Sequence, residues 1–103
     1  MLVKRQFQRQ LIKFPAEVSS NGEVCTGTTV WLSEKGFFVR SHQSFGIGTP
    51  VEIILYLTED ATCVLKGVVK FAQRSALLNK DNGMGIELTE KNKIYKEFLK
   101  EIE

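Results

Sequence analysis

The sequence predicts an all-β fold, a six-stranded antiparallel β-barrel followed by a C-terminal α-helix. Three observations lead to this prediction. From about residue 11 to residue 88 apolar and polar residues alternate, which is the period of strands with one buried face. Turn-forming residues interrupt the alternation at short intervals, a spacing typical of small barrels. After residue 89 the apolar residues recur at helical spacing instead.

The first two strands are expected at residues 12–18 and 23–32, joined by a tight hairpin. Between them lie Asn21 and Gly22, and Asn-Gly is the strongest short hairpin signal because both residues tolerate positive φ. Side chains along the second strand, which is rich in β-branched residues, should point alternately to its two faces. We expect Thr28, Val30 and Leu32 inward, and Thr29, Trp31 and Ser33 outward.

Four further strands are expected, at residues 37–40, 51–57, 62–73 and 84–88. In the strand at 51–57 every second residue is apolar, which predicts a core face of Val51, Ile53, Leu55 and Leu57. In the strand at 62–73 the predicted core face carries Leu65, Gly67, Val69 and Phe71. Gly67, inside that strand, is expected to mark a bend or bulge.

The C-terminal helix is predicted from the change of period. Its apolar residues fall at helical spacings among lysines and glutamates: Ile94, Tyr95, Phe98, Leu99 and Ile102. Thr89 is a suitable N-cap residue. Because the polar face mixes both signs of charge, we expect this helix to close one end of the barrel rather than to lie on a membrane.

With 103 residues the chain is expected to form one domain. We divide it into a basic leader (1–10), the barrel (11–89) and the helix (90–102). Hydrophobic and charged residues make up 43% and 25% of the chain, which argues against a disordered or disulfide-rich protein.

No apolar run approaches the roughly 18 residues of a membrane helix, so we expect no membrane insertion. The basic N-terminus lacks the apolar segment of a secretory peptide, and the expected location is cytoplasmic.

The sequence contains no recognisable group of catalytic or metal-ligating residues, so we expect neither an enzyme nor a bound metal or cofactor. Nucleophilic hydrolysis needs a base oriented by a carboxylate, and the single histidine, His42, has no such partner nearby in sequence. Cys25 and Cys63 lie in separate apolar segments without Cys-x-x-Cys spacing. With one histidine they cannot form a tetrahedral Cys/His zinc site, and we expect reduced thiols in the core.

Positive charge is concentrated near the N-terminus, although the net charge of the chain is only +2. Lys4, Arg5, Arg9 and Lys13 all precede the first acidic residue, Glu17. Arg5 and Arg9 return to the same side of the chain whether it is helical or extended. Guanidinium groups match phosphate oxygens and the O6/N7 edge of guanine. The segment is therefore either an anion site or a solvated basic leader.

The order of these motifs resembles the PilZ domain family over nearly the whole chain. The motifs are Arg5-x-x-x-Arg9, Ser33-x-x-Gly36, Gly67-Val68-Val69 and the run from Gly83 to Leu88 before the helix. The resemblance implies a six-stranded barrel that binds the bacterial second messenger cyclic di-GMP on its outer surface. It also implies that Arg5 and Arg9 hold phosphate and guanine groups, while Ser33 and Gly36 belong to a second binding motif.

Trp31 stands where the family's second motif has Asp or Asn. An indole N–H is a donor only, so it cannot replace a carboxylate that accepts hydrogen bonds from guanine. An outward Trp31 can instead stack on a purine, which is worth on the order of 1 to 3 kcal/mol. The leader segment, or Phe7 within it, can equally pack over Trp31. Both roles are compatible with the sequence.

From the resemblance, the predicted function is non-catalytic binding of cyclic di-GMP by a stand-alone domain that signals to an unidentified downstream protein, for example in motility. The alternative is a degenerate PilZ-like protein-interaction module that does not bind the nucleotide, and Trp31 motivates it. A third class is a barrel that binds single-stranded nucleic acid. A net charge of only +2 argues against that class, so we expect no DNA or RNA partner.

Overall fold

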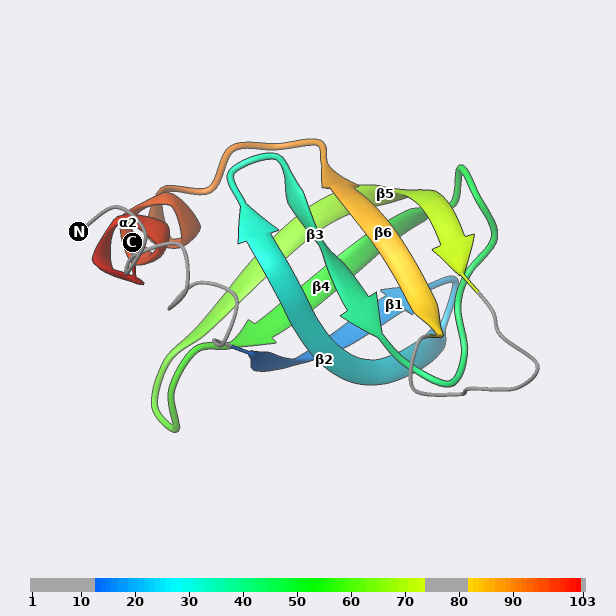
Figure 1. The fold of residues 1–103 in the computed structure, drawn as a ribbon, viewed down its shortest axis with the longest axis horizontal. Coiled ribbons are helices and arrows are strands. Elements are labelled where there is room, and N and C mark those ends of the chain that lie inside the picture. Colours follow the sequence, from blue (N-terminus) through cyan, green and yellow to red (C-terminus); the bar gives the residue numbers. More distant parts are fainter. Residues whose placement is uncertain (1–12, 74–81, 103) are drawn as a thin grey trace.

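The computed structural model describes residues 13–73 and 82–102 of the chain. They form a closed six-stranded antiparallel barrel with a helix at one end (Figure 1), which confirms the predicted fold class. The strands are β1 (Phe14–Ser20), β2 (Glu23–Ser33), β3 (Gly36–Arg40), β4 (Pro50–Tyr56), β5 (Thr62–Gln73) and β6 (Gly83–Leu88). The helix is α2 (Lys93–Ile102).

Pairing between strands that are far apart in sequence closes the barrel. Neighbours follow the order β1-β2-β3-β6-β5-β4, with β4 pairing back onto β1. Four pairs join consecutive strands, whereas the β3–β6 and β1–β4 pairs bring distant segments together. The β3–β6 pair matters most for function, because it places the turn after β2 beside the end of β6 (Figure 1).

The hairpin between β1 and β2 forms at the predicted Asn-Gly pair. Asn21 has φ of 52° and Gly22 has φ of 83°, the left-handed values that a two-residue hairpin turn requires. Ser20 and Glu23 are the last paired residues on either side of this turn. The turn therefore fixes the register of the whole β1–β2 ladder.

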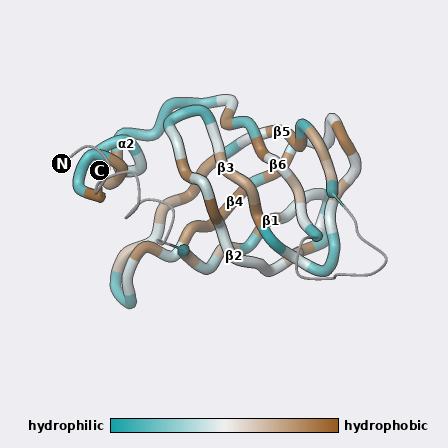
Figure 2. The backbone as a smooth tube through the Cα atoms, in the orientation of Figure 1, coloured by the Kyte–Doolittle hydropathy of each residue, from teal (hydrophilic) through white to brown (hydrophobic). Residues whose placement is uncertain are grey.

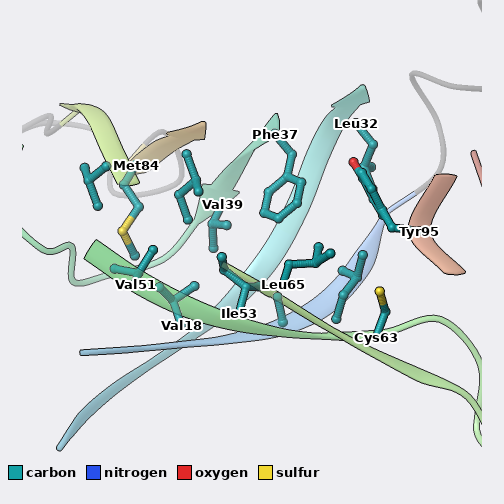
Figure 3. Close-up of a cluster of buried hydrophobic side chains, with 14 of the residues drawn as sticks. Val18, Leu32, Phe37, Val39, Val51, Ile53, Cys63, Leu65, Met84 and Tyr95 are labelled. Carbon is teal, nitrogen blue, oxygen red and sulfur yellow. The ribbon is translucent and has the colours of Figure 1, made fainter. Parts of the chain in front are cut away.

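The core fills the barrel interior with side chains from every strand and from α2 (Figure 3). Val51, Ile53 and Leu55 of β4 are buried, as the alternation predicts. Leu57 lies beyond the end of β4 and is only partly buried against the same cluster. Cys25 and Cys63 are free and buried, and burial raises the pKa of both thiols.

A bulge in β2 shifts the side-chain alternation on that strand. The register changes between Val30 and Ser33, where β2 carries one residue more than β3. Before the bulge Thr29 is fully buried, and its hydroxyl donates to a backbone carbonyl of β1 at 3.1 Å. Thr28 is only half-buried. The expectation of an inward Thr28 and an outward Thr29 is therefore wrong, whereas Trp31, beyond them, is exposed as expected.

A second bulge, in β5, lies between Val69 and Phe71. Val69 is fully buried, but Phe71 is 49% exposed and lies on the outer face, so its predicted place in the core is wrong. The bulge comes after Gly67, which pairs with Leu88 in regular register. A Cβ on Gly67 would lie 2.6 Å from the carbonyl oxygen of Glu87, so this glycine permits close approach of β5 and β6 rather than marking the bulge.

Helix α2 begins at Lys93, later than predicted, because Asn92 rather than Thr89 is its N-cap. The side-chain Oδ1 of Asn92 accepts a hydrogen bond from the backbone N–H of Tyr95 at 2.9 Å. Tyr95 and Leu99 are buried against the barrel, and α2 carries both hydrophilic and hydrophobic positions (Figure 2). The helix therefore closes one end of the barrel as predicted. Over residues 13–73 and 82–102, no helix is long and apolar enough to cross a membrane.

Candidate functional site

The turn between β2 and β3 is held in place on two sides. Within the turn, the hydroxyl of Ser33 donates to the carbonyl oxygen of Gly36 at 3.2 Å. On the side of β6, the N–H of Leu88 donates to the carbonyl oxygen of Lys35 at 2.7 Å. These hydrogen bonds fix the backbone from residue 33 to residue 36, which carries the predicted Ser-x-x-Gly motif.

Gly36 is buried where β3 packs closely against β6. It pairs with Glu87, and a Cβ at this position would overlap the carbonyl oxygen of Ile86. Because that oxygen belongs to the backbone, a side chain could be accommodated only by moving a strand. The glycine of the motif is therefore required by the packing of the barrel itself.

Trp31 occupies the bulge of β2 in a strained conformation. Its φ is 56°, and a non-glycine residue in the left-handed region costs on the order of 1 to 2 kcal/mol. The side chain is 61% exposed, and its ring packs against Phe38 with 5.6 Å between centroids. The bulge thus turns the indole outward and holds it against the barrel surface.

Three aromatic residues form a row across the outside of the barrel, which we call the outer aromatic row: Trp31, Phe38 and Phe71. Phe38 points outward between two core residues of β3 and stacks on Phe71 with 5.9 Å between ring centroids. Phe71 lies over Gly85 of β6, where a Cβ would overlap its ring. A glycine in β6 therefore makes room for the row.

The outer aromatic row forms the apolar part of a shallow depression of about 330 Å³, which we call the outer depression. Its polar lining comes from the turn, with Ser33 and Lys35, and from Lys70 and Glu87 on neighbouring strands. The ammonium of Lys70 lies 3.5 Å from the carboxylate of Glu87. Flat rings beside cations and one carboxylate suit a planar base attached to phosphate.

Helix α2 contacts the same turn from its other side. The hydroxyl of Tyr95 donates to the carbonyl oxygen of Ser33 at 2.7 Å, and its ring lies 6.1 Å from that of Phe37. Figure 3 shows Tyr95 reaching into the end of the barrel beside Leu32. The ammonium of Lys96 lies 4.0 Å from the carboxylate of Glu34, an exposed pair that adds little stability. Tyr95 is thus the main link between turn and helix.

The phenol of Tyr95 gives a prediction for alkaline stability. Burial raises the pKa of Tyr95 well above its usual value. The folded state therefore favours the neutral phenol, and this contribution to stability is complete at pH values below the unfolded pKa of about 10. As the pH rises above that value, the contribution is lost. Replacing Tyr95 with Phe should cost about 1 kcal/mol at neutral pH through the lost hydrogen bond. Above about pH 10 that difference should shrink, as measured by urea unfolding.

The chain's other tyrosine provides the matched control. Tyr56 lies at the end of β4 and is partly exposed, whereas Tyr95 is buried, and the hydrogen bond of the Tyr56 phenol to the Glu17 carboxylate is a surface contact that adds little stability. The Tyr56→Phe protein should unfold at nearly the same urea concentration as the parent at neutral pH. A stability difference between the parent and Tyr95→Phe that stays constant across alkaline pH would contradict the assigned role of the Tyr95 phenol.

The structure brings together three of the five predicted site residues. Trp31, Ser33 and Gly36 all line the outer depression. Arg5 and Arg9 lie outside the described residues. The sequence did not predict the contributions of Phe38, Phe71 and Glu87, because strand register, rather than spacing along the chain, brings them beside the motif.

A comparison with protein-family models adds an independent finding. The model of the PilZ domain matches residues 3–102, essentially the whole chain. The matched range includes the leader with both arginines, the turn and α2. No curated protein and no solved structure gives a match.

Proposed function

The chain belongs to the PilZ domain family, a family of cyclic di-GMP receptor and signalling modules, and from this membership we propose that it binds cyclic di-GMP at the outer depression. PilZ domains are generally binding domains without catalytic activity. The observation that carries the proposal is that Ser33 and Gly36 of the family's second motif, together with Trp31 at the position where that motif has Asp or Asn, line one outer surface with aromatic and cationic neighbours.

In this proposal the leader and the depression share the ligand. Arg5 and Arg9 bind the phosphates and a guanine edge, because guanidinium groups donate in a fork that matches both. Trp31 stacks on a base, which contributes on the order of 1 to 3 kcal/mol. Its exposed ring, supported from below by Phe38, is available for such stacking.

The proposed output is recognition by another protein. A domain that binds a messenger without catalysis acts through what it contacts. We place this receptor in the cytoplasm, where it signals to a downstream protein that controls bacterial motility or a related surface behaviour. The proposed binding requires neither a metal nor a cofactor besides the dinucleotide.

Calorimetric titration with cyclic di-GMP tests the proposal. The parent should bind saturably, and Arg5→Ala and Arg9→Ala should each weaken binding roughly 10- to 100-fold, the effect of losing charge-assisted hydrogen bonds. Lys4→Ala removes one leader charge outside the motif and is the matched control, with a small expected effect. The fluorescence of Trp31 should change on binding, and because it is the chain's single tryptophan the signal reports this site.

Two results would contradict the proposal. One is the absence of saturable heat and of any change in Trp31 emission with the parent protein. The other is an Arg9→Ala protein that binds as tightly as the parent. An equal loss of affinity for cyclic di-GMP in Lys4→Ala and Arg9→Ala would also count against specific binding by the motif. It would indicate general attraction between charges, which added salt screens.

A further inference from the structure

We propose that Glu87 reads the guanine base, supplying from β6 the carboxylate that the second motif of this chain lacks at position 31. This inference rests on the proposed function and deepens it, because it names the residue that selects the base. Its starting point is that Glu87 is the one carboxylate that lines the outer depression over the described part of the chain.

The strand register positions Glu87 beside the motif. Its neighbour Ile86 is buried in the core, so Glu87 points to the outer face, where its side chain is 54% exposed. On β3 its partner is Gly36, which has no side chain to cover it. The carboxylate therefore stands next to the Ser33 to Gly36 turn with open space on that side.

The contact that Glu87 makes now is weak enough for a ligand to replace. Its carboxylate lies 3.5 Å from the ammonium of Lys70, and the two side chains are 54% and 58% exposed. Ion pairs at this exposure contribute little to stability, since water screens them and holding two long side chains costs entropy. Exchanging Lys70 for hydrogen-bond donors on a base would therefore cost the protein little.

Guanine offers donors that match a carboxylate. Its Watson–Crick edge carries an N–H and an amino group side by side, and a carboxylate can accept from both with its two oxygens. The same edge of adenine presents one amino donor beside an acceptor nitrogen, which a carboxylate would repel. Trp31 can stack on either base, since every base has a π-face. In this proposal Trp31 contributes affinity by stacking on the base, and Glu87 contributes selectivity for guanine by recognising its edge.

The experiment compares two dinucleotides on matched variants. Cyclic di-GMP and cyclic di-AMP are titrated into the parent, Glu87→Gln, Glu34→Gln and Lys70→Met. Glu87→Gln should bind cyclic di-GMP roughly 10-fold more weakly and lose much of the preference for it over cyclic di-AMP, because an amide keeps one acceptor and adds a donor. Glu34→Gln makes the same change of charge on the turn, but Glu34 lines the groove beside α2 instead of the outer depression.

The variant Lys70→Met separates base reading from the ion pair. It removes the partner of Glu87 but leaves the carboxylate in place, so the selectivity for guanine should persist. Loss of selectivity in Lys70→Met, or equal effects of Glu34→Gln and Glu87→Gln, would overturn the inference. Unchanged selectivity in Glu87→Gln would overturn it while leaving the receptor function intact. A parent protein that binds neither dinucleotide would overturn both.

Discussion

The Ile53→Ala protein is expected to lose about 2 to 5 kcal/mol of unfolding free energy, the usual cost of removing a large aliphatic side chain from a closed core. Ile53 is fully buried at the centre of β4, where it is paired with Val18 on one side and Leu65 on the other. Both partners are buried too, so a cavity at this position has little freedom to collapse. Urea unfolding followed by circular dichroism measures the change.

A second isoleucine makes the control for this change. Ile47 lies in the loop before β4 and is 71% exposed, so Ile47→Ala should alter the unfolding free energy by less than about 0.5 kcal/mol. Equal losses in the two variants would mean that burial in the barrel does not set the cost, which would contradict the core described above.

The Gly36→Ala protein is expected to lose both stability and ligand affinity. The added methyl group would overlap the carbonyl oxygen of Ile86, so β3 and β6 must separate locally, at a cost of about 1 to 3 kcal/mol or more. The turn from Ser33 would move with β3 and change the shape of the outer depression. We expect a lower midpoint in urea unfolding and at least a roughly 10-fold weaker affinity for cyclic di-GMP.

Gly46→Ala is the matched control for the added methyl group. At that loop position the nearest atom to a new Cβ, the hydroxyl oxygen of Thr49, is 3.8 Å away, an ordinary contact distance. Stability and affinity should both stay close to those of the parent. A Gly36→Ala protein as stable as Gly46→Ala would show that β3 and β6 can separate without cost, contrary to the close packing argued here.

Local chemistry explains why most of the fold was predictable. The alternation of residues in β4 and the Asn-Gly pair before β2 each act through neighbouring residues, so the sequence was enough to predict them. The two bulges were not predictable in this way, because one inserted residue reverses the side-chain faces on one side of the bulge relative to those on the other side. Thr29 and Phe71 were misassigned for that reason.

The start of α2 shows a different limit. Thr89 and Asn92 are both good N-cap residues, and local preference does not choose between them. Tertiary contacts favour Asn92, whose side-chain amide also donates to the carbonyl oxygen of Val64 in β5 at 3.1 Å. Strand alternation predicted that Trp31 and Ser33 share an outer face, and the family resemblance added Gly36 to the site. Phe71 and Glu87 joined it through strand pairings that no local pattern encodes.

The hydrogen bond from Tyr95 to Ser33 has a thermodynamic consequence. One carbonyl group belongs both to the turn of the proposed binding site and to the docking of α2, so a displacement of either must affect the other. Linkage between two binding sites is reciprocal. If cyclic di-GMP changes the affinity of α2 for a partner protein by some factor, then that partner changes the affinity for cyclic di-GMP by the same factor. The barrel and its helix can in this way respond to two ligands at once.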